Sequence, residues 1–357
     1  MPKSKEPGLV FLDALRGLAA LVVFLGHAKF FLVPITLGEA IAGGAILTIV
    51  AAVIMQLFVF GHQAVVLFIF LSGFWVAYSQ MKRKLNKKDF LKRRFTKVYL
   101  PYFFAILIGL GIDSIGRYLF PVFYSNLVFT IESFFATVFL YGSLYGAVGS
   151  NTPIMTVAII IICYLLFLVF EKRLWLGFII GIIGTLAYVF YIPNPILFVF
   201  FYFIIWLMGA VTSKIYFGGK RLDLNTMWKK VCAHALDLVG VLFILWVLYK
   251  NFVLGFWYAD LPEDIFIGLS MSWLVYRLLT TKIKLALPKC FNTLSDYSYS
   301  LYLIHYPIII IIFAFMGKSW EWLIICIVLV TIFTFFFNYL IKYSNSAYDK
   351  LTNRAKQ

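Results

Sequence analysis

The stretch FLDALRGLAALVVFLGHAKFF, from Phe11 to Phe31, decides the fold class of this chain. It is apolar and long enough to cross a bilayer as a helix, yet it contains Asp13, Arg16 and His27. An ionisable side chain at the centre of a membrane-spanning helix costs about 2.5–3.5 kcal/mol on insertion scales. Such residues usually mark a functional site, so these three are the first candidates.

The spacing of the three residues predicts a polar side of this helix. Asp13 and Arg16 are three residues apart and can pair on one face. Arg16 and His27 are close to three full turns apart, so both project to the same side, about 16 Å from each other along the axis. With Arg16 at the cytoplasmic headgroups, His27 lies at or slightly past the middle of the membrane. The alternative is that His27 only makes a hydrogen bond that packs two helices.

The composition predicts an all-α, polytopic membrane protein. The chain is 63% hydrophobic and 20% aromatic, and its mean hydropathy is +0.95. Soluble domains average about 45–50% apolar residues. The formal charge of +16 lies between apolar segments, which is typical of membrane topology and does not indicate nucleic-acid binding. We interpret the first apolar stretch as a retained helix, because no signal-peptide cleavage site follows it.

Several familiar chemical motifs do not occur in the sequence. It has no Gly-rich phosphate loop, no H-E-x-x-H and no G-x-S-x-G. The cysteines are scattered, without a C-x-x-C pair or a metal-binding spacing. We therefore expect no metal and four reduced structural cysteines: Cys163, Cys232, Cys290 and Cys326.

The apolar segments predict about ten spans in a single domain, residues 1–357, with no appended extracellular domain. The basic run from Lys82 to Lys97 should stay on the side of the N-terminus, which requires an even number of earlier crossings. We therefore predict that Ile41–Phe60 is an outer interfacial helix with a break near Gly61. The predicted spans are Leu9–Leu32, Gln63–Tyr78, Val98–Ile112, Pro153–Phe170, Trp175–Ile192, Ile196–Ser213, His234–Tyr249, Ile265–Leu279, Tyr297–Met316 and Trp320–Ile341.

The distribution of charge favours this topology with both termini in the cytoplasm. All but four of the 31 lysines and arginines fall on the side assigned to the cytoplasm. The four on the outer side are Lys29, Arg117, Lys250 and Lys318.

Other features refine the prediction. Pro193-Asn194-Pro195 ends the fifth span, and a basic loop with Lys220 and Arg221 follows the sixth. A partly apolar outer segment, Asp113–Thr152, follows the third span. The fifth span also carries small residues whose spacing favours close helix contact, namely Gly177, Gly181 and Gly184.

The second span carries another candidate stretch, HQAVVLFIFLSGF, from His62 to Phe74. His62 is expected at its outer end, and Ser72 and Gly73 are expected deeper in the membrane. The structural alternatives are that His62 caps the helix at the interface and that Ser72-Gly73 serves helix packing.

The basic run ends in FLKRRFTKVYLP, residues 90–101, just before the third span. Arg94 and Lys97 are one turn apart, and Arg93 is adjacent. Paired cations at this position suit a phosphorylated ligand that enters from the cytoplasm. The alternative is an anchor on anionic lipid, which would explain most of the charge.

A fourth stretch, DYSYSLYLIHYP, residues 296–307, is expected to open the ninth span. It has hydroxyl groups at six of its twelve positions, including that of Tyr302, and it places His305 shortly before a proline. The structural alternative is that Tyr and Ser bond across helices and that Pro307 only kinks the helix.

Together, the four stretches resemble the acyltransferase-3 family of integral-membrane O-acyltransferases. The resemblance rests on Asp-x-x-Arg-Gly followed by His, on Leu-Phe-x-x-Leu-Ser-Gly-Phe, on Arg-x-x-basic before a proline, and on Ser-Tyr-Ser-Leu-Tyr-Leu-x-His-x-Pro, in that order. One departure is Lys97, which stands where the family has a second arginine. Another is that the extracellular esterase-like domain of some members is not expected here.

The resemblance implies a cytoplasmic acyl-CoA donor, most often acetyl-CoA, and an acceptor hydroxyl on an extracytoplasmic glycan or lipid-linked sugar. It implies a multi-pass protein of the inner or plasma membrane, whose partners are the lipid bilayer and these substrates. The sequence leaves the acceptor and the oligomeric state open, a homodimer included. By resemblance, His27 with Arg16 is catalytic; Arg93, Arg94, Lys97, Ser72 and Gly73 bind the donor; and Asp13, His62, Tyr302 and His305 are supporting residues.

The chemistry of a histidine fits this role, because an unperturbed imidazole titrates at about pH 6.5 and can accept a hydroxyl proton at neutral pH. Transient acylation of His27 and simple deprotonation of the acceptor both stay open.

Two rival functions are a transporter of an anionic or phosphorylated solute and a membrane O-acyltransferase of the other large type. The sequence lacks the inverted pair of broken helices typical of transporters, which argues against the transporter. The Ser-Gly-Phe and Arg-x-x-basic stretches argue against the second.

Overall fold

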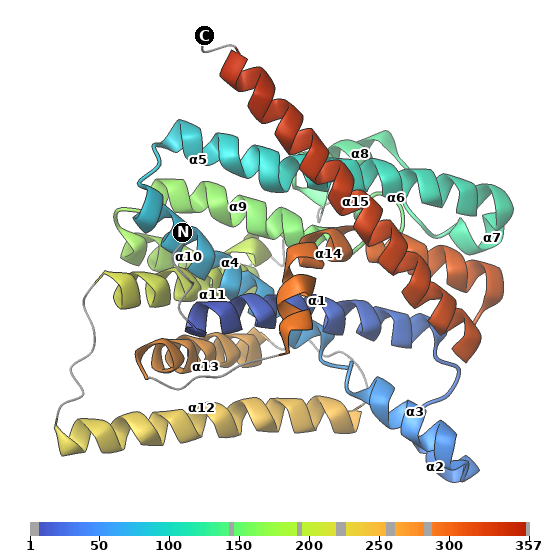
Figure 1. Ribbon diagram of the computed structural model, residues 1–357, viewed down its shortest axis with the longest axis horizontal. Coiled ribbons are helices and arrows are strands. Elements are labelled where there is room, and N and C mark those ends of the chain that lie inside the picture. Colours follow the sequence, from blue (N-terminus) through green and yellow to red (C-terminus); the bar gives the residue numbers. More distant parts are fainter. Residues whose placement is uncertain are drawn as a thin grey trace. The chain divides into compact units, whose positions relative to one another are not determined.

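The computed structural model describes residues 7–142, 146–190, 195–218, 226–254, 261–281 and 288–354 (Figure 1). In these ranges the regular elements are helices, as the composition predicts. The chain forms two compact units, each assembled from three separate segments. One comprises Met1–Val23, Val53–Lys84 and Ile162–Ser295; the other comprises Phe24–Ala52, Leu85–Ile161 and Asp296–Gln357.

The first unit is built on long apolar helices. Five of the described helices lie entirely within it: α4 (Gly61–Arg83), α10 (Leu174–Phe190), α11 (Pro195–Phe217), α12 (Met227–Leu254) and α13 (Leu261–Thr280). It also contains parts of α1 (Pro7–Leu32), α3 (Ile46–Gln56), α9 (Ile154–Phe170) and α14 (Lys289–Met316).

Close approach of backbones defines the packing of this unit. A Cβ atom at Gly73 of α4 would overlap the carbonyl oxygen of Trp206 in α11, and one at Gly209 of α11 would overlap that of Phe70 in α4. The two helices therefore cross where neither has a side chain. The glycines of α10 also face α11, which confirms the predicted close contact; their neighbours there are Leu207, Ile204 and Phe200.

The second unit contains part of α14 and other helical elements of widely different length. They are α2 (Leu37–Gly43), α5 (Lys87–Arg94), α6 (Leu100–Leu119), α7 (Pro121–Tyr124), α8 (Ile131–Val138) and α15 (Trp320–Arg354), with the π-helix η1 (Phe95–Tyr99). Tyrosine hydroxyls connect α6 and η1 to α8, because Tyr102 donates to the carbonyl of Thr137 and Tyr99 to that of Val138.

Among the described residues, seven helical segments are long and apolar enough to cross a membrane. Two further helices, α9 and α10, are apolar but shorter. Each of the ten predicted spans corresponds to a helix, whereas the number of crossings and the side of the termini stay predictions. In the region predicted as an outer interfacial helix, Ile41–Phe60, the structure contains the end of α2 and all of α3, and a turn at residues 57–60 separates α3 from α4. The outer, interfacial location of this region stays a prediction.

Several helix boundaries differ from the prediction. The helix α12 begins at Met227 rather than near His234, because the Thr226 hydroxyl accepts the N–H of Lys229 and caps it. The helix α6 continues through Asp113, which was predicted to begin the outer segment. The ninth span is preceded by two more turns of α14. Two predicted features cannot be compared in full, because some of their residues lie outside the described residues. These are Pro193 and Asn194 of the predicted break after the fifth span, and Lys220 and Arg221 of the predicted basic loop.

Candidate active site

Two histidines meet in the second unit, one from α1 and one from α14. Nδ1 of His27 lies 3.0 Å from Nε2 of His305, and their rings stack with centroids 5.1 Å apart. His305 is fully buried, and its Nδ1 lies 3.0 Å from the carbonyl oxygen of Leu301. The sequence predicts both histidines as candidates, and the structure brings them into direct contact.

The partners of the two rings determine where the protons are. A carbonyl oxygen can only accept, so Nδ1 of His305 carries the hydrogen that Leu301 receives. The neutral ring of His305 then has an acceptor at Nε2, and His27 must donate its Nδ1–H to it. Neutral His27 therefore has its lone pair at Nε2, which is the nitrogen that can take a proton from a substrate.

Aromatic side chains surround the histidine pair. Tyr306 meets the His27 ring edge-on at 4.8 Å between centroids, and Phe24 meets His305 edge-on at 6.1 Å. The ring of Tyr302 lies 5.9 Å from that of His305, and its hydroxyl donates to the carbonyl of Pro153. Tyr302 thus ties α14 to the segment before α9, and this apolar shell limits water around the imidazoles.

The segment before α9 is itself held by a buried carboxylate. Asp113 of α6 is 1% exposed and accepts hydrogen bonds of 2.7 Å from both the N–H and the hydroxyl of Ser150. The next residue, Asn151, donates 2.9 Å to the carbonyl of Leu303 in α14. Sequence reasoning did not single out Asp113, Ser150 or Asn151 as site residues. An acidic residue within an apolar run was the available signal for Asp113.

Arg16 belongs to the first unit and also contacts α14. Its Nη2 donates 2.8 Å to the hydroxyl and 3.3 Å to the carbonyl oxygen of Ser295. The predicted pair with Asp13 is present at 3.9 Å, at the limit of an ion pair. A Cβ at Gly17 would overlap the backbone of α14 at Phe291, so this glycine permits the close approach that lets Arg16 reach Ser295.

His62 has a carboxylate partner in the first unit. Its Nε2 lies 2.9 Å from both oxygens of Asp264, which is fully buried at the start of α13. The helix cap at this end is Phe60, which makes no side-chain capping bond, so the cap predicted as the alternative for His62 is wrong. Beside this pair, Glu263 bonds to Lys250 of α12.

The Ser72–Gly73 pair makes helix contacts in the first unit. The hydroxyl of Ser72 is 3.1 Å from that of Tyr164 in α9, and it accepts 3.2 Å from the indole N–H of Trp206. Together with the glycine crossing, these bonds give the pair a packing role. Its predicted part in donor binding stays a prediction.

The predicted donor-binding cations lie where the helix geometry changes. Arg93 and Arg94 occupy the last turn of α5, and Lys97 lies in η1. The hydroxyl of Thr96 donates to the carbonyls of Lys92 and Arg93, which accompanies the wider π-turn. The guanidinium of Arg94 lies over the Phe90 ring, 5.1 Å from its centroid. Such π-turns often occur at functional sites.

The all-helical fold, with helices long and apolar enough to cross a membrane, defines a multi-pass membrane protein, and its candidate site contains the paired imidazoles of His27 and His305. The chain belongs to the acyltransferase-3 family, since the family model for the acyltransferase domain matches residues 9–343, nearly its whole length. Comparisons with curated proteins and with solved structures gave no match. In the described part of the chain, no group of three His, Cys, Asp or Glu residues could hold a metal.

Proposed function

We propose that the protein is a membrane O-acyltransferase that moves an acyl group, acetyl in the first instance, from cytoplasmic acyl-CoA to a hydroxyl of an extracytoplasmic glycan or lipid-linked sugar. The family supports acyl transfer in general. The observation that carries the finer proposal is the His27–His305 bond, because it makes Nε2 the basic nitrogen of a neutral His27.

In this proposal, Nε2 of His27 removes the proton as the acceptor oxygen attacks the thioester carbon. The carbon–sulfur bond of acyl-CoA breaks, and the leaving thiolate takes the proton from the imidazolium. His305 is a positioning residue, since it orients His27 through Nδ1 and favours the imidazolium that forms. In a covalent variant, Nε2 attacks the thioester carbon first, the carbon–sulfur bond breaks and the CoA thiolate leaves. The acceptor oxygen then takes the acyl group from the acyl-histidine, and its proton passes to the thiolate.

The remaining predicted residues have roles around this step. Arg94 and Lys97, with Arg93 beside them, offer cationic groups for the phosphates of the donor. Ser72 and Gly73 shape the donor-binding region. Arg16 is proposed as a catalytic residue together with His27, whereas Asp13, His62 and Tyr302 support the site. The proposed topology has ten spans in one domain of the inner or plasma membrane, with both termini in the cytoplasm.

Acetyl transfer from labelled acetyl-CoA to membrane glycans tests the proposal in nanodiscs that contain the full chain. His27→Asn is the sharpest variant, because the amide can still donate at the position of Nδ1 but has no group in place of Nε2. We expect its rate to fall about 10²–10⁴-fold, the usual contribution of a general base, with the unfolding temperature unchanged. Retention of activity in both His27→Asn and His27→Ala would refute the role of His27. A labelled acyl adduct that His27→Asn removes would identify the covalent variant.

A further inference from the structure

Two adjoining cavities lie inside the first unit, bounded by α1, α4, α12 and α13. The larger has a volume of about 610 Å³ and the smaller about 340 Å³. Both are within the size range of small-molecule sites, about 300–1,000 Å³. Four residues line both cavities and make them continuous: Leu15, Leu67, Ile244 and Met271.

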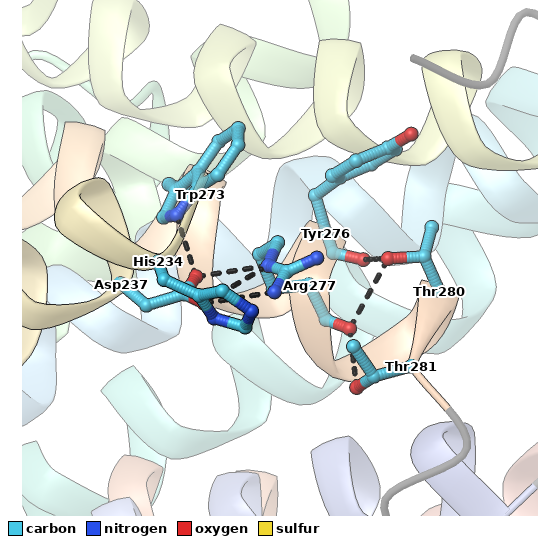
Figure 2. Close-up of polar contacts among 7 residues, drawn as sticks. All are labelled: His234, Asp237, Trp273, Tyr276, Arg277, Thr280 and Thr281. Atoms are coloured by element: carbon cyan, nitrogen blue, oxygen red, sulfur yellow. Dashed lines mark hydrogen bonds and ion pairs between the residues drawn. The ribbon is translucent and has the colours of Figure 1, made fainter. Parts of the chain in front are cut away.

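The larger cavity has a polar end. Its lining includes His234 and Asp237 from the first turns of α12, and Arg277 and Thr281 from the end of α13. Figure 2 shows Trp273, Arg277 and His234 arranged around the carboxylate of Asp237. The remaining lining residues of this cavity are apolar, so it has the form of a site for an amphiphile.

Hydrogen bonds hold this polar end rigidly. The carboxylate of Asp237 accepts from Nε and Nη2 of Arg277, both at 2.9 Å, and from the indole N–H of Trp273 at 2.8 Å. Nδ1 of His234 lies 3.3 Å from the same carboxylate. The paired fork fixes the guanidinium, and its third nitrogen, Nη1, has no bonded partner among the described residues.

The charge around this end is positive. The carboxylate of Asp237 is balanced by Arg277, while Lys230 lies one turn before His234 on the exposed start of α12. The rim therefore complements an anionic head rather than a neutral or cationic one.

The helix α12, which lines both cavities, is the least buried of the candidate spans in the described part of the chain. Only 17% of the apolar window of α12 is buried, the lowest share among the seven candidate spans. Leu238, Val239 and Leu245 on this helix are more than half exposed. Bilayer phospholipids are thus the molecules that surround the wall of the cavity.

The smaller cavity contains one polar side chain, that of Gln63. It is 7% exposed, and neither atom of its amide has a hydrogen-bond partner in the described ranges. A hydrocarbon chain that extended against this amide would offer its N–H and C=O groups no hydrogen-bond partner, which is unfavourable. Chain atoms in the larger cavity, in contrast, contact apolar walls. Gln63 thus sets a limit to how far a chain can enter.

We propose that the larger cavity binds one acyl chain of an anionic phospholipid, whose phosphate lies at the rim formed by Lys230, His234 and Arg277. Nη1 of Arg277 and the ammonium of Lys230 bind the phosphate, and the chain runs between α12 and α1 toward Ile244. Gln63 ends the site and restricts the chain length. This lipid site is separate from the histidine pair and does not depend on the proposed acyl transfer.

Native mass spectrometry of the full chain in detergent tests this proposal, with phosphatidylglycerol and phosphatidylcholine of the same acyl chains as probes. We expect one tight phosphatidylglycerol adduct and weaker binding of phosphatidylcholine. Ile244→Trp should remove the tight adduct because the indole fills the cavity. Leu245→Trp is the matched control. Leu245 is the next residue after Ile244, and its side chain is more than half exposed on α12.

Two further variants test the head and the chain separately. Lys230→Gln is exposed and should weaken the phosphatidylglycerol adduct about fivefold, the effect of one basic residue near an anionic lipid surface. Gln63→Leu should shift the preference toward longer chains. Equal affinity for both lipids, an adduct that Ile244→Trp leaves unchanged, or a chain preference that Gln63→Leu does not move would overturn the proposal.

Discussion

Nδ1 of His27 and Nε2 of His305 lie 3.0 Å apart, although 278 residues separate them in the chain. The bond to the carbonyl of Leu301 fixes the tautomer of His305, and that in turn fixes the tautomer of His27. A helix carbonyl therefore determines which nitrogen of His27 is basic. The same logic orients a catalytic histidine through a carboxylate in other enzymes, whereas here the ring of His305 orients His27.

The orienting role of His305 can be separated from proton transfer by two substitutions. A glutamine at this position can place its amide oxygen near the location of Nε2 and accept from His27, whereas a leucine cannot. We expect His305→Leu to lower the rate of acyl transfer within the 10²–10⁴-fold range of acid–base catalysis, and we expect His305→Gln to restore about a tenth or more of it. Equal loss in both variants would instead indicate that His305 must itself carry a proton.

The crossing of α4 and α11 should be intolerant of added volume. A Cβ at Gly73 meets the Trp206 carbonyl, which belongs to helix backbone and cannot rotate away. We expect Gly73→Ala to lower the free energy of unfolding by about 1–3 kcal/mol, the usual cost of overpacking. Gly111→Ala in α6 is the control, because nothing lies within 4 Å of the added atom. Thermal unfolding of both variants measures the difference, and similar behaviour of the two would contradict the crossing.

The capping box of α2 should respond to pH. The carboxylate of Glu39 accepts from the N–H of Thr36 at 2.7 Å and from its hydroxyl at 2.8 Å, and these bonds, the backbone one first, lower the pKa of Glu39. The native pKa is below the unfolded one, so the stabilisation is present above the ordinary value of 4.5 and is lost as the pH falls through the native pKa.

Hydrogen-exchange protection of the amides of α2, measured from pH 7 downward, checks this expectation. Protection in the wild-type protein should decrease below about pH 4.5. Glu39→Gln is the matched control, because a glutamine can close the same capping box without titrating. A pH response that persists in this variant would assign the change to another group.

The sequence predicts the fold class and the stretches that carry the site. Polar groups are costly in a membrane, so an ionisable residue within an apolar run indicates a site from the sequence alone. His27, Arg16, His62 and His305 were all singled out in this way. What the sequence cannot supply is their partners. Arg16 was expected to pair with Asp13, three residues away, but it bonds more closely to Ser295.

Distance along the chain explains the remaining gaps. The partner of His62 is Asp264, 202 residues later, and no helical period relates the two. The Asp237–Arg277 pair shows the same limit. Asp237 lies within a predicted apolar span, so the cost of an ionisable group marks it in the sequence as it marks His27. Its partner Arg277 is 40 residues later, in another helix, and helical spacing does not indicate it.

Asp113 provides a test of whether the histidine pair depends on the segment before α9. The carboxylate accepts two hydrogen bonds from Ser150, and that segment contacts α14 through Asn151 and Pro153. Asp113→Ala leaves the buried N–H and hydroxyl of Ser150 without their acceptor. Hydrogen bonds to charged groups contribute about 1.5–3 kcal/mol each, so we expect a loss of stability of at least that size.

The same change should slow acyl transfer, because Asn151 and Tyr302 lose the support that positions α14 around His305. Ser114→Ala is the control on the neighbouring position of α6, since that exposed hydroxyl bonds only to the carbonyl of Leu110 in its own helix. Its stability should stay within about 0.5 kcal/mol of the wild type. Chemical unfolding and initial rates with labelled acetyl-CoA, measured in parallel, decide the matter: a destabilised Asp113→Ala protein with an unchanged rate would show that the histidine pair is held by α1 and α14 alone.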